Sequence, residues 1–373
     1  MLIGIDASRA VAGQRTGTEA YAYHLIQALI SLTAEQAIRL RLYFNGPPPE
    51  DLLAHAPHVE PVIIPFPRLW THFRLAWELH RRPPDLFFTP AHVIPWSYLG
   101  RSAATVHDLG YHHFPQTHPW WQRAYLRWST RHNGRRAHII LADSAATKTD
   151  LIQFDQIPAA KIKVVYPGAP PGLQPVTAAA ELATVARRYQ IEPPYLLYLS
   201  TIQPRKNLVR LVAAYADLPQ PAPQLVIAGK MGWLAEPILA AIRALPPAVQ
   251  ACIVLPGYVD ERDKAALLSG ATAVVYPSLY EGFGFPVLEA QLCGTAVICA
   301  NTSSLPEVAG DGALLVDPLD TAGLTAAMQQ VIMDADLRRR LIVQGQVNAA
   351  RFTWENAARQ TLDLFRRIKN HAD

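Results

Sequence analysis

Residues 273–290 read AVVYPSLYEGFGFPVLEA, and this stretch joins a short apolar run to a segment with helical spacing. The run at 273–276 is β-branched and apolar, which predicts a buried strand. Pro286 suits the first turn of a helix, where its missing N–H costs nothing. The loop between them carries two glycines, Gly282 and Gly284, which let a ligand approach the backbone closely. Because a helix N-terminus offers free N–H groups and partial positive charge, this connection predicts a phosphate site.

Two glutamates, Glu281 and Glu289, flank the glycine loop. A carboxylate does not help to bind phosphate, but it accepts two hydroxyl hydrogen bonds at once, so we expect both glutamates to bind sugar hydroxyls. The loop therefore predicts a nucleotide-sugar site, with phosphates on the backbone amides and hydroxyls on the acids. The alternative is structural: Glu281 would be solvated, and Glu289 would be a first-turn acid that the helix dipole favours.

The same alternation of short apolar runs and helical patterns continues along the whole chain. Near-continuous apolar runs are typical of parallel strands covered on both faces, and helices between them favour doubly wound α/β sheets. A stretch rich in proline and glycine at 166–180 interrupts the pattern and predicts a linker between two domains. We expect a ligand in the cleft between them, at the carboxyl ends of the strands. The predicted strands are residues 2–5, 40–44, 59–64, 86–88, 103–106, 139–142, 195–200, 224–228, 252–255, 273–276 and 296–300.

The composition is that of a globular protein: of 373 residues, 50% are hydrophobic and 17% are charged. No stretch of about 18 uncharged apolar residues occurs, so we expect no membrane span. The start, MLIGIDASRA, predicts a first buried strand rather than a signal peptide. The three cysteines lie in apolar segments without metal-ligand spacing, which favours buried thiols in a reducing cytoplasm. No nucleic-acid-binding signature is present, and we expect no such partner.

The segment from residue 111 to residue 140 is basic and aromatic, with five arginines, five histidines, three tryptophans and no acid. Four of the arginines recur every four residues, at Arg123, Arg127, Arg131 and Arg135. That spacing predicts one arginine ridge along a helix. The ridge suits peripheral contact with anionic lipid at the inner face of a membrane, or contact with a lipid-linked or charged acceptor. The alternative, which we favour at this point, is a solvated or salt-bridged helix face with the tryptophans in the core.

The glycine loop resembles a known family. EGFGFPVLE, residues 281–289, resembles the motif of two glutamates separated by seven residues in the family-4 retaining glycosyltransferases, which have the two-domain GT-B fold. Other segments resemble the same family in the same order, and together they cover most of the chain. These segments are residues 4–29, 106–115, 198–215, 225–233, 254–278 and 303–318.

The resemblance implies two Rossmann-like domains that face a cleft. Residues 1–170 would form the acceptor-binding domain, and residues 178–351 would form the donor-binding domain. A C-terminal helix within 352–373 would return to pack on the first domain. Its apolar residues, from Trp354 to Ile368, lie on one helical face.

In the donor domain, the resemblance implies a role for each residue that matches the family's motifs. Lys206, with Arg205 before it, would hold the donor pyrophosphate and stabilise charge on the leaving nucleotide diphosphate. Glu281 would lie near the hydroxyls of the transferred sugar, and Glu289 would bind the ribose. Amides facing the phosphate or sugar are expected at Phe283, Gly284 and Phe285, and the loop that borders the base is expected at Gly257, Tyr258 and Val259.

In the acceptor domain, His107 follows the predicted strand 103–106 and matches the family histidine close to the reacting sugar. Its alternative role is that of a histidine satisfied within a loop. Asp108 would either orient His107 or cap the turn. Gly17, between a strand and a helix, is expected to let a ligand approach the backbone.

The function implied is retaining transfer of a hexose from a nucleotide-diphosphate sugar, GDP-mannose or a UDP-sugar, to a glycan or lipid-linked acceptor. Such transfer serves cell-envelope or exopolysaccharide biosynthesis in the cytoplasm. No metal or other cofactor is expected, because no aspartate pair is placed to bridge a metal to the diphosphate. Thr201, Thr18 and Glu19 depart from residues that some family members carry. Two alternatives therefore stay open, a catalytically silent sugar-nucleotide-binding subunit and a sugar-nucleotide epimerase on the same scaffold.

Overall fold

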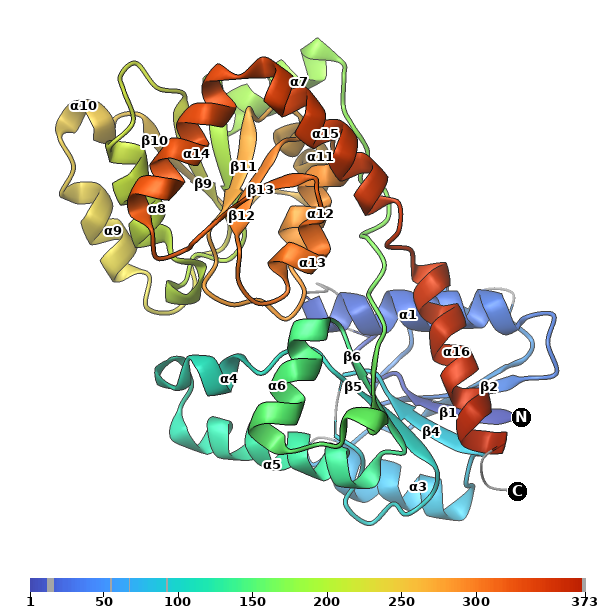
Figure 1. The fold of residues 1–373 in the computed structure, drawn as a ribbon. Coiled ribbons are helices and arrows are strands. Elements are labelled where there is room, and N and C mark those ends of the chain that lie inside the picture. Colours follow the sequence, from blue (N-terminus) through green and yellow to red (C-terminus); the bar gives the residue numbers. More distant parts are fainter. Residues whose placement is uncertain (12–16, 54–55, 67, 92, 371–373) are drawn as a thin grey trace. The chain divides into compact units, whose positions relative to one another are not determined.

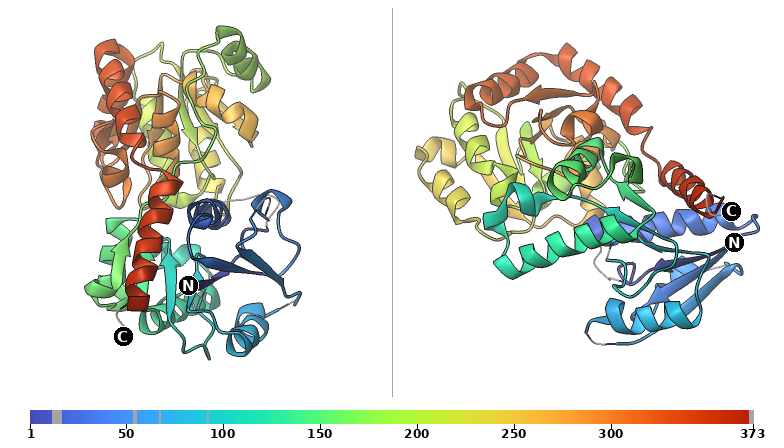
Figure 2. Two further views of the ribbon diagram at one scale, coloured as in Figure 1. Left: turned by 90° about the vertical axis from the view of Figure 1, so that its right-hand side faces the viewer. Right: turned by 60° about the horizontal axis from the view of Figure 1, so that its bottom comes forward.

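The computed structural model describes residues 1–11, 17–53, 56–66, 68–91 and 93–370. It divides into two compact units, which we describe separately (Figure 1). Unit 1 contains Met1–Gly168 and Phe352–Asp373, and unit 2 contains Ala169–Arg351. Within each unit, helices cover both faces of one central sheet (Figures 1 and 2). The expected doubly wound α/β architecture is confirmed.

Unit 1 is built on a seven-stranded sheet in the order β3-β2-β1-β4-β5-β6-β7, and all of its pairings are parallel. Parallel neighbours bring their carboxyl ends to the same edge of a sheet, so the loops after β1, β4, β5 and β6 emerge together. The strands are β1 (Leu2–Asp6), β2 (Arg39–Phe44), β3 (Val59–Ile63), β4 (Leu86–Thr89), β5 (Ser102–Val106), β6 (Ile139–Ala142) and β7 (Ile162–Val164).

The helices of unit 1 come from both ends of the chain. They are α1 (Gly17–Thr33), α2 (Glu50–Leu53), α3 (Ala76–Arg81), α4 (Gly110–His113), α5 (Trp120–Arg136), α6 (Ala145–Asp155) and α16 (Trp354–Asn370). A π-helical turn, η1 (Thr71–Leu75), leads into α3, and single 3₁₀ turns lie at Pro115–Thr117 and Ala159–Lys161.

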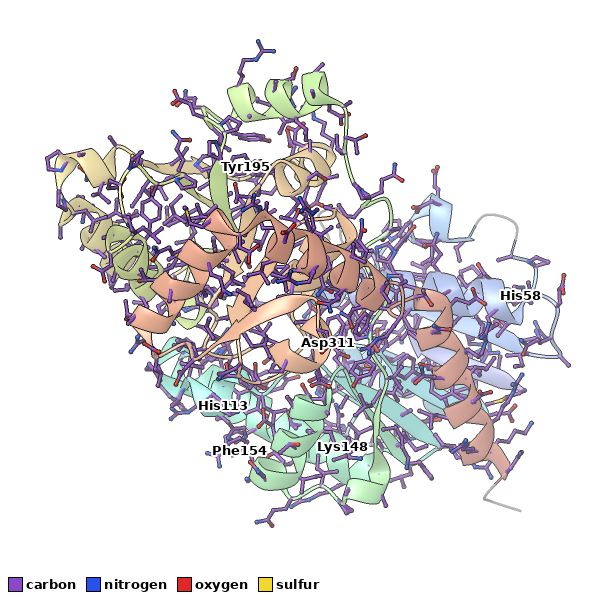
Figure 3. The ribbon with its side chains drawn as sticks, turned by 45° about the horizontal axis from the view of Figure 1, so that its top comes forward. His58, His113, Lys148, Phe154, Tyr195 and Asp311 are labelled. Atoms are coloured by element: carbon purple, nitrogen blue, oxygen red, sulfur yellow. The ribbon has the colours of Figure 1, made fainter. Side chains whose placement is uncertain are left out.

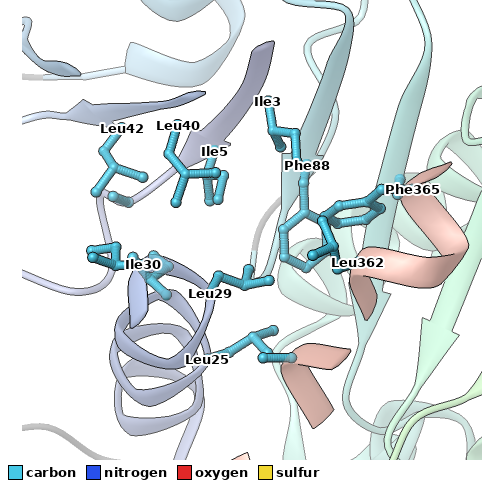
Figure 4. Close-up of a cluster of buried hydrophobic side chains, with 14 of the residues drawn as sticks. Ile3, Ile5, Leu25, Leu29, Ile30, Leu40, Leu42, Phe88, Leu362 and Phe365 are labelled. Atoms are coloured by element: carbon cyan, nitrogen blue, oxygen red, sulfur yellow. The ribbon is translucent and has the colours of Figure 1, made fainter. Parts of the chain in front are cut away.

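The C-terminal helix α16 completes the core of unit 1. Leu362 and Phe365 are buried, and the Phe365 ring lies 5.0 Å from the ring of Phe88 on β4. Figure 4 shows these side chains meeting those of β1, β2 and α1 in one apolar cluster. Burying such side chains contributes about 1.5–3 kcal/mol each, so the last turns of the chain help to hold the N-terminal sheet.

Unit 2 is built on a six-stranded parallel sheet in the order β10-β9-β8-β11-β12-β13. Its strands are β8 (Tyr195–Leu199), β9 (Gln224–Ala228), β10 (Ile253–Gly257), β11 (Ala273–Tyr276), β12 (Val297–Ala300) and β13 (Ala313–Val316). Its helices are α7 (Ala179–Arg188), α8 (Leu208–Ala216), α9 (Glu236–Arg243), α10 (Pro247–Gln250), α11 (Glu261–Ser269), α12 (Phe285–Leu292), α13 (Leu305–Ala309), α14 (Thr321–Met333) and α15 (Ala335–Ala349), with a 3₁₀ turn, η4, at Pro204–Lys206.

The strand Tyr195–Leu199 illustrates how the sheet of unit 2 is enclosed. The Tyr195 side chain (labelled in Figure 3) is buried, and its hydroxyl donates to the Leu267 carbonyl on α11 at 2.7 Å. Burial raises the pKa of this phenol, so it stays a neutral donor. In the part of the chain that the structure describes, no helix combines the length and the apolar character needed to span a bilayer.

Candidate active site

The glycine loop of unit 2 connects β11 to α12, as the sequence predicts, with Pro286 in the first turn of α12. Gly284 adopts φ +114°, and a Cβ atom there would lie 2.7 Å from Leu305 Cδ2, so both conformation and space require glycine. The Ser304 hydroxyl donates to the carbonyls of Glu281 and Phe283 at 2.9 and 2.6 Å and holds the loop against α13.

Glu281, at the start of this loop, is a buried carboxylate that accepts from four side chains. Its Oε1 accepts from Lys206 Nζ at 2.5 Å, from the Tyr276 hydroxyl at 2.9 Å and from the Ser278 hydroxyl at 2.5 Å. Its Oε2 accepts from the Arg205 guanidinium at 3.3 Å. Burial raises the pKa of Glu281, but the two cations and these hydrogen bonds outweigh it and lower the pKa to about 2. Glu281 is therefore ionised at any physiological pH.

Lys206 and Arg205 lie on the 3₁₀ turn η4, between the carboxyl end of β8 and the start of α8. Lys206 is 5% exposed, and its Nζ also donates to the Tyr276 hydroxyl at 2.6 Å. Arg205 donates to the Tyr280 carbonyl at 2.8 Å. The next residue, Asn207, adopts φ +61°, and its amide donates to the Pro277 carbonyl at 3.1 Å. The turn is thereby tied to the loop after β11, so two predicted site segments meet.

Glu289 is held by a lysine that sequence reasoning missed. Lys264 on α11 donates through Nζ to Glu289 Oε1 at 2.6 Å. Burial lowers the pKa of Lys264, but Glu289 raises it more, and the pKa lies above its usual value. Glu289 is the fifth residue of α12, so the alternative that made it a first-turn acid is wrong. Lys264 lies 25 residues before Glu289, so only the fold brings these two together, whereas Tyr276 and Ser278 lie five and three residues before Glu281.

The remaining predicted donor residues lie in two loops of unit 2, the loop after β10 and the glycine loop. Gly257 ends β10 with φ +77°, and open space surrounds the position of a Cβ atom. Tyr258 is half-exposed, and Lys230 Nζ lies 5.0 Å from its ring centroid, whereas Val259 is buried. In the glycine loop, Phe283 is buried and packs edge-on against Phe285 with centroids 5.0 Å apart. The sheet order places β10 and β11 with two strands between them.

In unit 1, His107 follows β5 directly, at the carboxyl edge of the sheet. Its Nδ1 lies 2.7 Å from Asp143 Oδ2, and its Nε2 lies 2.9 Å from the Pro90 carbonyl oxygen. The ring of Tyr21 on α1 packs edge-on against the imidazole, with centroids 4.6 Å apart. Asp108 accepts from the Gly110 N–H at 2.9 Å. This contact supports the role of Asp108 as a cap of the turn.

Gly17, the other residue predicted in unit 1, is the first residue of α1 and is exposed, with open space around the position of a Cβ atom. Residues 12–16 of the same predicted loop lie outside the described residues. Glu19, two positions later, pairs with Arg9 at 3.1 Å. Two buried carboxylate oxygens lie at the same edge of the sheet, Asp6 Oδ2 and Asp143 Oδ1, and neither has a hydrogen-bond partner among the described residues.

The arginine ridge lies on α5, as its spacing predicts, but its surroundings differ from the favoured interpretation. The tryptophans are not in the core: Trp120, Trp121 and Trp128 are 75%, 61% and 41% exposed. One arginine, Arg131, pairs with Asp155 at the end of α6 at 3.0 Å, a partner outside the basic segment. The partner of Arg131 is therefore supplied by a different helix, and the tryptophans of α5 face outward.

Within the ranges given above, no group of three histidine, cysteine, aspartate or glutamate side chains converges as metal ligands would. Positive charge for an anionic ligand is nonetheless present in unit 2, from Arg205 and Lys206 beside the N-terminus of α8.

Each of the two units matches a known protein-family model. Residues 15–172 match the model of Glycosyltransferase Family 4, and residues 186–347 match that of Glycosyl transferases group 1. The O-antigen chain mannosyltransferase B of Escherichia coli is 32% identical over 311 residues, which cover 82% of this chain and 81% of that protein.

Solved structures agree with the fold. The sucrose-phosphate synthase of Thermosynechococcus elongatus superposes with a TM-score of 0.75 at 21% identity, covering 98% of both chains. HepE of Anabaena, solved in complex with UDP-glucose, gives a TM-score of 0.72 at 18% identity, covering 98% of this chain and 99% of its own.

Proposed function

The chain belongs to glycosyltransferase family 4, and from this premise we propose that it transfers mannose from GDP-mannose to a glycan or lipid-linked glycan acceptor, with retention of the anomeric configuration. The observation that carries the proposal is the cluster of Arg205 with the buried Lys206 and Glu281, in which Glu281 contacts both cations. The choice of mannose is supported by the name of the E. coli relative. Transfer of this kind would extend a cell-surface polysaccharide.

The cluster is suited to a leaving nucleotide diphosphate. As the bond from sugar to diphosphate breaks, negative charge grows on the phosphate oxygens, and preorganised cations nearby stabilise it more than the ground state. Lys206 and Arg205 lie at a strand-to-helix connection, where backbone N–H groups also favour phosphate. We propose that they supply this charge without a metal. Glu281 orients both cations through its two oxygens and would also contact a hydroxyl of the transferred sugar.

Glu289 and Lys264 would serve the nucleoside part of the donor. A carboxylate can accept two ribose hydroxyl hydrogen bonds, and Lys264 fixes the orientation of the Glu289 side chain through its 2.6 Å contact. The loop Gly257–Val259 would border the base. These contacts are made equally in the ground state and the transition state, so they would govern affinity more than turnover.

A direct assay tests this proposal. The protein is incubated with GDP-mannose or with UDP-glucose, together with a manno-oligosaccharide acceptor, and the products are followed by mass spectrometry and NMR. We expect one added mannose, release of GDP, and an α-linkage from the α-configured donor. A β-linked product would overturn the proposed retention. A product formed from UDP-glucose but not from GDP-mannose would overturn the proposed donor. Binding without any product would favour a silent binding subunit, and a changed sugar on an intact nucleotide would favour an epimerase.

We further propose that the exposed face of α5 makes a peripheral contact with an anionic membrane. Trp121, Tyr125 and Trp128 recur at helical spacing, and Tyr125 is half-exposed like its neighbours. Trp and Tyr are the side chains that favour the interface between headgroups and acyl chains. Arg123, Arg127 and Arg135 lie on the same helix, and none of the three has an ion pair in the described part of the chain.

The aromatic surface extends beyond α5. Trp96 and Phe73 are both about half-exposed, and their rings lie 5.8 Å apart. His72 connects them to α5, with its ring 5.3 Å from that of Trp96 and 5.7 Å from that of Trp128. On α3, Trp77 is half-exposed between Arg74 and Arg81, which lie 5.2 and 5.3 Å from its ring centroid. Aromatic rings flanked by arginines suit an anionic lipid headgroup region.

A further inference from the structure

We propose that Asp143 is a positioning residue that holds the His107 side chain in one orientation with both ring nitrogens protonated, so that His107 serves transfer as a fixed cation and not as a proton acceptor. The role in transfer rests on the proposed function, whereas the protonation of His107 stands on the geometry of unit 1 alone. Asp143 lies in the loop directly after β6, and no sequence motif singles it out.

The two partners of the imidazole decide its protonation. The Pro90 oxygen is a backbone carbonyl, which can only accept, so Nε2 must donate across the 2.9 Å contact. Asp143 Oδ2, 2.7 Å from Nδ1, accepts as a carboxylate. With Asp143 ionised, an acceptor lies on each side, and the ring satisfies both contacts only when it carries both protons. A neutral ring would leave one nitrogen facing an acceptor with no hydrogen between them.

Strand register places the pair. β5 and β6 are adjacent parallel strands, and Val106 is registered against Ala142. His107 and Asp143 are the next residue of each strand, so they emerge side by side at the carboxyl edge of the sheet. Behind them, Ser144 caps α6 through the Thr147 N–H at 3.0 Å, and the Thr147 hydroxyl donates to the His107 carbonyl at 3.2 Å. Main chain and ring of His107 are therefore both fixed.

The groups that face His107 come from four elements. Tyr21 of α1 packs against the ring and bonds Thr105 of β5 at 3.4 Å. Asp143 follows β6. Asp108 directly follows His107 in the chain, and the Pro90 carbonyl follows β4. Burial lowers the pKa of His107, but the carboxylates of Asp143 and Asp108 and the Pro90 carbonyl outweigh it and raise the pKa above its usual value of 6.5. Burial also raises the pKa of Tyr21 far above 10.0, so the phenol stays neutral, and burial raises the pKa of Asp143 as well.

Asp143 binds the imidazole through one of its two carboxylate oxygens. Its second oxygen, Oδ1, is buried without a hydrogen-bond partner among the described residues, although the side chain is nearly inaccessible. Leaving a buried acceptor unpaired is unfavourable, so the charge on Asp143 is favoured by its contact with the His107 ring through Oδ2. The acceptor hydroxyl must then lose its proton to a group other than His107, because the imidazolium has no lone pair to accept it.

The test uses Asp143→Asn, which keeps the shape and one acceptor oxygen but removes the charge. Asp150→Asn is the matched control. Asp150 pairs with His113 at 3.0 Å, a second histidine–aspartate pair in unit 1. His113 lies on α4 with its ring edge-on to Phe154 of α6 (Figure 3). Protein labelled with ¹⁵N and ¹³C in histidine gives the protonation of each ring by NMR, and His107→Gln identifies the His107 signal.

In the wild type, we expect His107 to stay doubly protonated when histidines near the usual pKa of 6.5 have lost a proton. In Asp143→Asn, burial should dominate, and the His107 pKa should fall below 6.5. The pH at which kcat/KM declines should fall with it. At pH 7.5 we expect about a tenfold loss of kcat/KM for each unit by which the pKa drops below the assay pH, with recovery toward acid pH. Asp150→Asn should leave the His107 signal and the pH profile unchanged.

Two results would overturn the inference. A singly protonated His107 in the wild type at pH 6.5 would show that Asp143 does not hold the cation, and this measurement needs neither a variant that folds nor a substrate. A lowered His107 pKa in Asp143→Asn with an unchanged pH profile would show that the charge plays no part in transfer. If no sugar nucleotide gives product, the proposed function fails, while the NMR result still decides the role of Asp143.

Discussion

Lys206 and Glu281, 75 residues apart in the chain, form a buried ion pair with Nζ 2.5 Å from Oε1. The lysine follows β8 and the glutamate follows β11, and these two strands are neighbours in the sheet of unit 2. The sequence assigns these two residues to different parts of the donor, but in the structure they contact each other directly. A substitution at either one therefore removes a contact of the other.

Replacing Lys206 with alanine should reduce the rate of sugar transfer by about 10² or more, the scale for losing one group that stabilises developing charge. It should also weaken binding of the nucleotide diphosphate and destabilise unit 2 by about 3–5 kcal/mol, because Glu281 would keep a buried charge with one cation fewer. Steady-state kinetics and thermal unfolding measure these effects. Arg243→Ala, which removes an exposed cation of the same unit, is the control. A Lys206→Ala protein with normal turnover would remove this lysine from the site.

The Glu281 ion pair should make stability depend on pH in the acid range. The pKa of Glu281 is about 2 in the folded protein against its usual 4.5, and a depressed acid pKa gives stability that is present above 4.5 and lost as the pH falls toward 2. The shift corresponds to about 3 kcal/mol. The melting temperature of the wild type should therefore exceed that of Glu281→Gln most above pH 4.5, and the difference should shrink with acidification. A difference that is constant from pH 6 to pH 3 would contradict a low pKa.

Replacing Glu289 with glutamine should weaken nucleotide binding while kcat changes little, because a ribose contact contributes equally to ground state and transition state. Lys264→Met should have the same effect, since it releases the Glu289 side chain. Calorimetric titration with GDP gives the affinities. Glu261→Gln is a close control, because Glu261 lies 3.7 Å from the same Lys264 but is largely exposed. Equal affinity for GDP in Glu289→Gln and the wild type would exclude the ribose role.

The exposed face of α5 should bind anionic vesicles. Changing Arg123, Arg127 and Arg135 to glutamate should abolish co-sedimentation with vesicles that contain phosphatidylglycerol, since each arginine near such a surface contributes about 1 kcal/mol. Binding of the wild type should decline steeply between low and physiological salt, because the attraction is screened over about 8–10 Å. The double variant Trp121→Ser with Trp128→Ser should weaken the part of vesicle binding that persists at high salt.

The control for this experiment changes three arginines on other surfaces, Arg262, Arg339 and Arg359, to glutamate, which alters the net charge by the same amount. Hydrolysis or transfer of the donor in solution should be unaffected in both triple variants. A wild-type protein that ignores anionic vesicles at low salt would return α5 to an ordinary solvated helix.

The strands that the sequence missed share one property. β7 (Ile162–Val164) and β13 (Ala313–Val316) are the last strands of their sheets. They have three and four residues, fewer than the five of β3 and β10, the edge strands that the sequence did predict, and their residues are only partly buried. The interior strands, by contrast, are buried along most of their length, and their apolar runs stand out in the sequence.

The sequence by itself determined the α/β class, a linker within residues 166–180, and the strand, glycine loop and helix around Glu281. These features depend on local patterns: apolar runs of strand length, a glycine that must adopt positive φ, and a proline in the first helical turn. Chemistry within a few residues is enough to specify them.

Only the tertiary structure decided the partners of the charged side chains. Lys264 with Glu289, Asp143 with His107 and Asp155 with Arg131 each join residues 24 to 36 positions apart. No local pattern marks such pairs, because strand order and register determine which loops emerge side by side. The outward face of the tryptophans on α5 was decided in the same way, since apolar side chains become core only where another element covers them.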